Sequence, residues 1–443
     1  MGHVYIVHCI DTEGPLYEGL EANFKRLKSI YGIELEPSEK NLQAIRNREI
    51  DLGDHTDAVA NTFDITRTVF NEDWEQLKAM LNQITSQEFT DQLTDSAGNG
   101  WKFNWFCLDH VGFSGDNPRR RDTGDHKIFD FYKKYTLNDQ SLGSIQWHYH
   151  PLPISGHFHN CGTTYLNSGN VSEVLAKKII DRKWFPSCYR PGFHAERPDS
   201  NWFLEQWIPF DYANQSNNTG AIDQPDLSGG RYGNWERAPQ SWIPYHPDHD
   251  DYQKVGSMRR WIARCLNMHA RLREISQDDV NEAFLEAQNG NDVLLSFTNH
   301  DFRNMAPEIE KVRDYIRKAA VAHADVSFSF EEAGAGFRKC LGLSSTTPKL
   351  SCELIKLRDK KWILDVKAKG DIFGPQPFLA IKTKDGRYYW ENFDFVGDSH
   401  WNFTFDQEQV PIELIKTIGV AANSSSGISE VEIIDVDNYD INL

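Results

Sequence analysis

The sequence predicts an α/β fold in which a β/α barrel is followed by a smaller C-terminal β-sandwich. Over residues 1–342, short β-rich runs alternate with longer segments of helical pattern, the order of a parallel sheet or barrel. Seven or eight candidate strands favour a barrel over a doubly wound sheet. Residues 343–349 (LSSTTPK) have the composition of a linker. Residues 350–443 contain short alternating runs separated by turn signals, which is typical of a sandwich.

The predicted elements follow from the spacing of apolar residues. The barrel strands are predicted at Val4–Cys9, Lys102–Leu108, Ser144–Tyr149, Cys188–Arg190, Phe210–Ala213, Ser241–Tyr245, Val293–Phe297 and Val326–Phe330. The helices are predicted at Trp74–Ile84, Val171–Asp181, Asn201–Gln206, Met258–Asn267, Asp279–Gln288 and Ile309–His323. The sandwich strands are predicted at Cys352–Lys356, Trp362–Lys367, Phe378–Lys382, Arg387–Glu391, Trp401–Phe405 and Val431–Asp435.

Composition and charge exclude several classes of partner. The formal net charge is -18, and such a surface repels both phosphate backbones and anionic membranes, so neither nucleic acid nor membrane insertion is expected. No stretch approaches the roughly 18 apolar residues of a membrane span. The seven cysteines form no CxxC pair, which predicts reduced thiols in a cytoplasmic protein.

Polar residues at strand ends are the candidates for chemistry, because active sites of β/α barrels lie at the carboxyl-terminal ends of the strands. Asp11 and Glu13 follow the first strand and lie two residues apart, so in an extended chain they share one face. Two carboxylates so placed repel each other and need a cation or a shared proton. The alternative is a surface strand end with two solvated acids.

Histidines at the end of the third strand provide the donor type that divalent metals prefer. His148 and His150 also share one face of a strand, and neutral imidazoles so placed are common zinc ligands. A second pair, His157 and His159, follows nearby, and which imidazoles bind metal stays open between the two pairs.

Two further strand ends carry polar side chains. Arg190 precedes Pro191-Gly192, so a rigid turn would hold it where its guanidinium can orient a carboxylate. The apolar strand that begins at Val293 leads to His300 and Asp301, and a histidine there can donate a proton to a leaving group. Each of these residues, taken alone, is also compatible with a structural role.

A sugar is the kind of ligand that the surrounding residue types suit, because sugars bind aromatic faces and hydrogen-bonding groups. The candidate substrate-binding residues are Trp147, Tyr149, Asp211, Trp235 and Asp301, although most tryptophans of this region are expected to belong to the core.

Taken in order, these motifs resemble the polysaccharide deacetylases, the NodB-like group called carbohydrate esterase family 4. Asp11…Glu13-Gly14-Pro15, His148-Tyr149-His150-Pro151, Arg190-Pro191-Gly192, Pro209-Phe210-Asp211-Tyr212 and Leu295 through His300 are similar to the family's successive motifs. The resemblance covers residues 3–335 and is greatest to deacetylases of bacterial O-antigen clusters. Two departures stand out: the acid pair is Asp-x-Glu in place of adjacent Asp-Asp, and the histidine spacing is shorter by two residues.

The resemblance implies a deformed (β/α)7 barrel and a role for each motif. Glu13, His148 and His150 would bind a divalent metal. Zinc is the expected ion for histidine and carboxylate ligands, although cobalt, nickel and iron suit the same ligand types. Asp11 would be the general base, held by Arg190, and His300 would be the general acid, with Asp301 or another neighbour setting its tautomer. The roles of Asp11 and Glu13 can also be exchanged. The implied reaction is removal of the acetyl group from an N-acetylated sugar of a bacterial surface polysaccharide.

Two other functions remain compatible with the sequence. One is a metal-dependent glycoside hydrolase, and the other is a catalytically inactive protein that binds carbohydrate. The predicted sandwich also has three open roles: binding carbohydrate, packing against the barrel or forming a homodimer.

Overall fold

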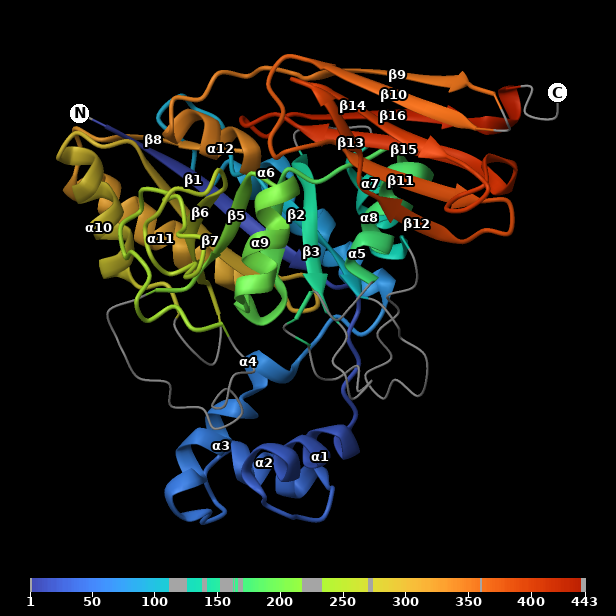
Figure 1. Ribbon diagram of the computed structural model, residues 1–443. Helices are drawn as coiled ribbons and strands as arrows, with labels where there is room; N and C mark the ends of the chain where they lie inside the picture. Colours follow the sequence, from blue (N-terminus) through green and yellow to red (C-terminus); the bar gives the residue numbers. More distant parts are fainter. Residues whose placement is uncertain are drawn as a thin grey trace.

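The structure, a computed structural model, describes residues 2–110, 126–137, 142–151, 162, 164–165, 170–216, 233–269, 274–358 and 361–439. The first part of the chain forms a closed barrel of seven parallel strands with helices around it (Figure 1). The strands are β1 (His3–Thr12), β2 (Asn104–His110), β3 (Ser144–His150), β4 (Cys188–Pro191), β5 (Phe210–Asn214), β6 (Trp261–Asn267) and β7 (Val293–His300).

Strand β1 closes the ring and also carries an eighth strand. Its last four residues, 9–12, pair with β2, and residues 4–11 pair with β7. Its first half pairs with β8 (Ser327–Phe330). The β1–β2 pairing therefore completes the ring of seven strands near the carboxyl-terminal end of β1, where Asp11 is the register partner of His300.

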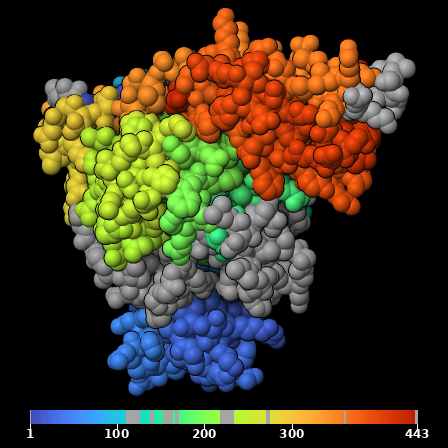
Figure 2. All heavy atoms as spheres, viewed as in Figure 1, coloured from blue at the N-terminus to red at the C-terminus, as the bar shows by residue number. Residues whose placement is uncertain are grey.

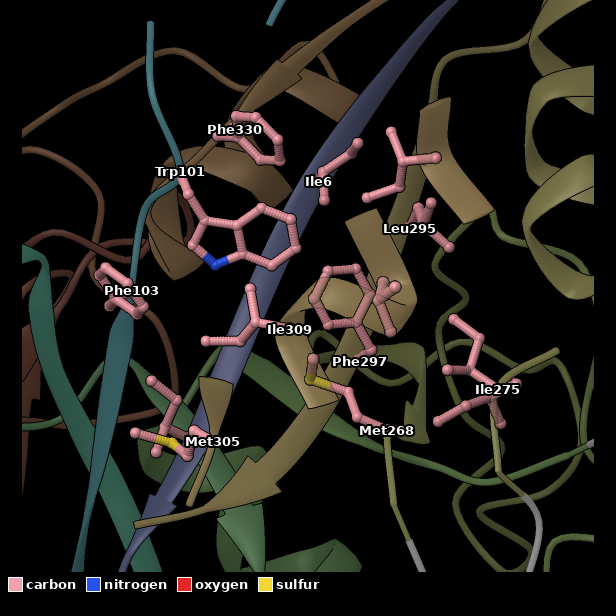
Figure 3. Close-up of a cluster of buried hydrophobic side chains, with 14 of the residues drawn as sticks. Ile6, Trp101, Phe103, Met268, Ile275, Leu295, Phe297, Met305, Ile309 and Phe330 are labelled. Carbon is pink, nitrogen blue, oxygen red and sulfur yellow. The ribbon is translucent and has the colours of Figure 1, made fainter. Parts of the chain in front are cut away.

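Helices pack on the outside of the barrel and close one end of it. They are α5 (Trp74–Ile84), α6 (Gln87–Thr90), α7 (Lys127–Thr136), α8 (Asn170–Arg182), α9 (Pro198–Trp207), α10 (Gln277–Gln288), α11 (Ala306–Ala322) and α12 (Ala333–Cys340). Figure 3 shows part of the largest apolar cluster, in which Ile6 of β1 and Phe297 of β7 pack with Ile309 of α11. Phe337 of α12 packs with interior residues, so α12 plugs the amino-terminal end.

Alternation along each strand separates the two faces, because successive side chains of a strand point to opposite sides. In β1, Ile6 and Ile10 join the outer cluster with the helices, whereas Val7 and Cys9 join the interior cluster. The same alternation brings Asp11 to the interior, at the open carboxyl-terminal end.

One predicted helix and one predicted strand are wrong. Met258–Asn267 was expected to be helical but contains strand β6, and Ser241–Tyr245 forms no strand beyond a single bridge at Tyr245. Strand β6 is buried on both faces, with Cys265 inside the barrel and Leu266 outside. A strand without polar alternation cannot be distinguished from a buried helix by periodicity, and the arginines and Ala263 of this segment favour the helical interpretation.

A helical insertion between β1 and β2 was not predicted. It comprises α1 (Leu20–Tyr31), α2 (Glu39–Arg46), α3 (Thr56–Thr62) and α4 (Ile65–Thr68). Its own apolar core consists of Phe24, Leu27, Leu42, Ile45, Val59 and Phe63. In Figure 1 these helices form a separate blue group beyond the carboxyl-terminal ends of the strands.

The base of the insertion is fixed to the barrel close to the strand ends. The backbone N–H of Leu16 donates to Asn71 O at 2.9 Å, and the N–H of Asn71 donates to Phe302 O at 2.7 Å. The Asn71 side chain donates to the carbonyl of Asp301 at 2.8 Å. The two ends of the insertion therefore meet beside the end of β7.

The C-terminal region forms two four-stranded antiparallel sheets around a common core. The first sheet has the order β13-β14-β10-β9, and the second has the order β12-β11-β15-β16. Their strands are β9 (Lys349–Lys356), β10 (Trp362–Lys369), β11 (Phe378–Thr383), β12 (Tyr388–Glu391), β13 (Asp394–Gly397), β14 (His400–Phe405), β15 (Ile415–Asn423) and β16 (Ser429–Asp435). Trp401 is buried in the shared core, whereas Trp390 on the edge strand β12 is 41% exposed.

The second of these sheets packs against helix α8 of the barrel. Its barrel-facing side chains, Phe378, Ala380, Ala421 and Val431, share one apolar cluster with residues of α8 and α9. Asp181 of α8 accepts hydrogen bonds from Lys382 Nζ at 2.9 Å and from the Tyr388 hydroxyl at 2.7 Å. Figures 1 and 2 show this orange and red region lying along one side of the barrel. In the described ranges, no helix combines the length and apolarity needed to cross a membrane.

Candidate metal centre at the barrel mouth

Six of the predicted site residues converge at the carboxyl-terminal end of the barrel. They come from four strands: Asp11 and Glu13 from β1 and the turn after it, His148 and His150 from β3, Arg190 from β4 and His300 from β7. The His300 side chain is 24% exposed, and the other five residues are buried. The strand alternation that makes Asp11 and His148 point inward therefore gathers these groups within the barrel mouth.

Glu13, His148 and His150 form the one group of three metal-ligating side chains found among the described residues. The two Nε2 atoms lie 2.9 Å apart, and Glu13 Oε1 lies 3.8 Å from Nε2 of His148 and 3.7 Å from Nε2 of His150. A point equidistant from these three atoms lies about 2.0 Å from each, which is the length of zinc–nitrogen and zinc–oxygen bonds. The donor set and its spacing therefore fit a divalent ion.

The tautomer of His148 suits a metal ligand. Its Nδ1–H donates to the backbone carbonyl of Arg190 at 2.9 Å, so Nε2 carries the free lone pair and faces Glu13. Metal-binding histidines commonly donate their second N–H in this way, which fixes the ring orientation. Burial opposes the charged imidazolium, but the carboxylates of Asp11 and Glu13 outweigh burial and raise the pKa of His148. The same two carboxylates that favour a proton on the His148 ring would favour a metal cation in its place.

Arg190 orients the carboxylate of Asp11. Its Nε–H and Nη2–H donate to Oδ1 and Oδ2 of Asp11 at 2.6 and 2.9 Å. Burial alone would raise the pKa of Asp11, but the Arg190 guanidinium and the nearby His148 hold that pKa well below its usual range. Asp11 is therefore ionised and fixed in orientation beside the candidate ligands.

His300 faces both acids. Its Nε2 lies 3.9 Å from Asp11 Oδ2 and 3.9 Å from Glu13 Oε1. Partial desolvation at the barrel mouth and the charge of Arg303 lower the pKa of His300 to about 4, so the ring is neutral at pH 7. Nδ1 is buried and has no hydrogen-bond partner among the described residues, so its tautomer is set by neither Asp301 nor another of these residues.

Asp301 holds the turn that presents Glu13. Its carboxylate accepts the backbone N–H of Glu13 at 2.8 Å, that of Gly14 at 3.1 Å and the hydroxyl of Tyr132 at 2.7 Å. Burial raises the pKa of Asp301 to about 6 in spite of these three donors. Its carboxylate is thus directed at the backbone of the β1 turn and at Tyr132.

Gly192 makes room for one of the candidate ligands. A Cβ at this position would lie 2.5 Å from Cδ2 of His150, so a larger residue would displace the imidazole. The Phe193 ring also packs against His150, with ring centroids 5.6 Å apart. The Pro191-Gly192 turn, which was expected to hold Arg190, therefore also sets the position of His150.

The remaining candidate substrate-binding residues are buried away from the mouth. Trp147 and Tyr149 face outward from β3 into the α8 cluster, and Trp147 donates its indole N–H to Asp109 at 3.0 Å. Asp211 forms a buried ion pair with Arg260 at 3.2 Å. Trp235 is 0% exposed and belongs to a separate apolar cluster. Their placement does not support contact with a substrate, and substrate binding by these residues stays a prediction.

Two residues at the site were not predicted. Tyr132 of α7 binds Asp301, and His194 lies behind Arg190, with its Nδ1 3.4 Å from Arg190 Nη2. His194 follows Arg190 by four residues, and this proximity is the one signal that could have identified it. Nothing in the pattern around Tyr132 indicates its role.

The second histidine pair, His157 and His159, lies outside the described residues, so replacement of His148 or His150 by one of them stays a prediction. Comparison of the chain with protein-family models, curated proteins and solved structures yields no match.

Proposed function

We propose that this protein is a metal-dependent deacetylase that hydrolyses the N-acetyl group of an amino sugar in bacterial surface polysaccharide biosynthesis. The observation that carries the proposal is the proximity of two units at one barrel mouth. One is the ligand group of Glu13, His148 and His150, and the other is the ionised Asp11 held by Arg190. Amide hydrolysis needs both an electrophilic activator and a base.

The resemblance to the NodB-like polysaccharide deacetylases supports the same reaction. The closed barrel of seven parallel strands is compatible with the deformed (β/α)7 barrel of that family. The described cysteines are free thiols, which agrees with the proposed cytoplasmic location.

Glu13, His148 and His150 would hold the metal, and Zn²⁺ is the proposed ion because it favours histidine and carboxylate ligands in tetrahedral geometry. Such an ion supplies Lewis acidity: it lowers the pKa of water and polarises the acetyl carbonyl. With these three residues as ligands, a bound ion would keep a position for water or substrate. His148 keeps its lone pair available through its bond to the Arg190 carbonyl.

Asp11 acts as the general base. Its carboxylate is ionised and aligned by Arg190, so it accepts the proton of the attacking water. Arg190 contributes orientation as well as charge, since its two N–H groups match the two oxygens of the carboxylate.

His300 transfers a proton to the departing sugar amine. It is neutral at pH 7, because its pKa is about 4, and must receive a proton before donating one. Asp11 Oδ2, which holds the proton taken from water, lies 3.9 Å from His300 Nε2, so the proton reaches His300 through one bridging water. One proton thus passes from water through Asp11 and His300 to the amine nitrogen, while the hydroxyl oxygen joins the acetyl carbon and the C–N bond breaks.

The reaction can be tested with purified full-length protein loaded with Zn²⁺ and a panel of N-acetylated amino sugars, free, nucleotide-linked and polymeric. We expect release of acetate together with a free amine and no change in glycan length. A shortened glycan without acetate would instead identify a glycoside hydrolase. Binding of the sugars without any product would identify an inactive carbohydrate-binding protein.

A further inference from the structure

We infer that His194 is a positioning residue, which holds the Arg190 guanidinium against Asp11. The inference deepens the proposed function and rests on it, because Asp11 is the base only in that function. It concerns a residue that neither the motifs nor the candidate metal ligands include.

Arg190 is fixed on the side that faces away from Asp11. Nη1 donates to the carbonyl of Tyr212 at 2.6 Å and lies 3.1 Å from Sγ of Cys265. Nη2, which binds Asp11, is also directed at Nδ1 of His194 at 3.4 Å. Among the described residues, His194 is thus the one side chain besides Asp11 that contacts Nη2 of Arg190.

The contact with Arg190 determines the tautomer of His194. A guanidinium only donates hydrogen bonds, so Nδ1 must accept and the ring proton must lie on Nε2. Nε2 lies 3.2 Å from Oδ1 of Asn267, an acceptor, on β6. Burial and the charge of Arg190 keep the ring neutral by lowering the pKa of His194 well below its usual value. A chain of directed contacts therefore runs from Asn267 through His194 and Arg190 to Asp11.

The backbone at His194 is held in an unfavourable conformation. Phe193 and His194 have φ angles of 53° and 51°, in the left-handed region that residues with a Cβ rarely adopt, and they are consecutive. Two contacts hold this turn from outside: Gly233 N–H donates to Phe193 O at 3.1 Å, and the Trp235 indole donates to His194 O at 2.8 Å. A Cβ at Gly233 would lie 1.7 Å from His194 O.

The strained turn serves the site through both of its side chains. Phe193 packs on the candidate ligand His150, and His194 contacts the arginine that holds Asp11. Strained backbone that the surrounding structure maintains is found preferentially at functional sites. A relaxed turn would move both side chains away from these partners.

The test compares His194→Ala and His194→Asn with a matched control, His8→Ala. Asn tolerates the left-handed backbone, and its Oδ1 can accept a hydrogen bond near the position of Nδ1. His8 is equally buried and also has both ring nitrogens hydrogen-bonded, but it lies on the outer face of β1 with Trp101 and Asn299.

We expect His194→Ala to lower kcat for acetate release by about 10- to 100-fold, with KM within about threefold and bound Zn²⁺ per chain unchanged, as for loss of a group that supports a catalytic residue. His194→Asn should restore kcat to within about threefold of wild type. His8→Ala should lower thermal stability and leave kcat unchanged. Three results would overturn the inference. The first is a wild-type kcat in His194→Ala, and the second is an equal loss of kcat in His194→Ala and His194→Asn. The third is a loss of kcat in His8→Ala as large as that in His194→Ala.

A measurement without turnover separates this inference from the proposed function. In ¹⁵N NMR of histidine side chains, His194 should carry its proton on Nε2, and its Nδ1 resonance should shift in Arg190→Lys. If the wild-type protein releases no acetate, the proposed function fails. The contact between His194 and Arg190 is tested separately, by the ¹⁵N resonances of the His194 ring. A proton on Nδ1, or an Nδ1 resonance unaffected by Arg190→Lys, would overturn the contact.

Discussion

Arg190 and Asp11 form a two-point ion pair inside the barrel, with N–O distances of 2.6 and 2.9 Å and both side chains buried. The pair joins β4 to β1 directly beside the group of Glu13, His148 and His150. Its geometry needs a planar fork, which arginine has and lysine lacks. The orientation of Asp11 therefore depends on the arginine shape as well as on its charge.

Arg190→Lys should lower kcat by at least about 100-fold while the protein retains its metal, because a point charge cannot align both oxygens of Asp11. The matched control is Arg260→Lys, since Arg260 is also fully buried and paired with two acids, Glu196 and Asp211, outside the site. Both variants should unfold at lower temperature. Equal kcat losses in the two variants would mean that Arg190 acts through stability alone.

Asp301 is predicted to support metal affinity instead of substrate binding. In Asp301→Asn, an NH₂ group replaces one of the two carboxylate oxygens that accept the backbone N–H groups of Glu13 and Gly14. The turn that presents Glu13 is then held less firmly, which should weaken Zn²⁺ binding by about 10- to 100-fold. Competition with a chromophoric chelator measures this dissociation constant. The control is Asp95→Asn, because Asp95 holds the backbone N–H groups of Ala97 and Asn99 elsewhere in the fold. Zn²⁺ affinity should be unchanged in the control, and a wild-type affinity in Asp301→Asn would refute the supporting role.

Packing of the C-terminal sheets on the barrel can be tested at one glycine. A Cβ at Gly419 of β15 would lie 2.6 Å from Ile179 Cγ2 of α8, whereas a Cβ at Gly397 would meet nothing within 4 Å. Gly419→Ala should therefore lower the free energy of unfolding by about 1–3 kcal/mol through overpacking. Gly397→Ala should change it by less than about 0.5 kcal/mol. Denaturant titration measures both, and equal effects would contradict the close packing of β15 on α8 at Gly419.

A pH-dependent contribution to stability is expected from Glu274, which joins His269 to Lys311 of α11 and lies 3.7 Å from Arg67 of α4. Burial opposes ionisation, but the hydrogen bonds from His269 and Lys311 outweigh it and lower the pKa of Glu274 to about 2. A carboxyl with a lowered pKa stabilises the fold above its unfolded pKa, and this stabilisation is lost as the pH falls from about 4.5 towards 2.

Glu274→Gln should therefore lower the melting temperature at pH 7, and the difference from wild type should shrink progressively below about pH 4.5. The exposed Glu353→Gln on β9 is the control, with no such difference expected. A Glu274→Gln difference that is constant from pH 7 to pH 3 would contradict the assigned ion pairs.

The site was predictable because its residues end apolar strands. Asp11, His148, Arg190 and His300 each follow a run of buried residues, and parallel strands of a barrel bring such ends together. The identity of the supporting contacts was not predictable. Asp301 was expected to serve His300 or the substrate, and only tertiary packing brings its carboxylate to the turn after β1.

The fold was predictable where periodicity was clear and not elsewhere. Helix α5 has the predicted bounds Trp74–Ile84, because its apolar residues recur at helical spacing. Strand β6 was predicted as a helix, since both of its faces are buried and no alternation shows. The helices of the insertion are short and separated by polar segments, and their common core depends on contacts that no single segment displays.

The claim that a metal and a base act together is tested most directly by metal content and acetate release in the same preparations of wild type, Asp11→Asn and His148→Ala. We expect one divalent ion per chain in wild type and in Asp11→Asn, with acetate release at least about 1,000-fold slower in Asp11→Asn. His148→Ala should retain no ion and show no activity. Wild-type rates in Asp11→Asn, or stoichiometric metal in His148→Ala, would contradict the account.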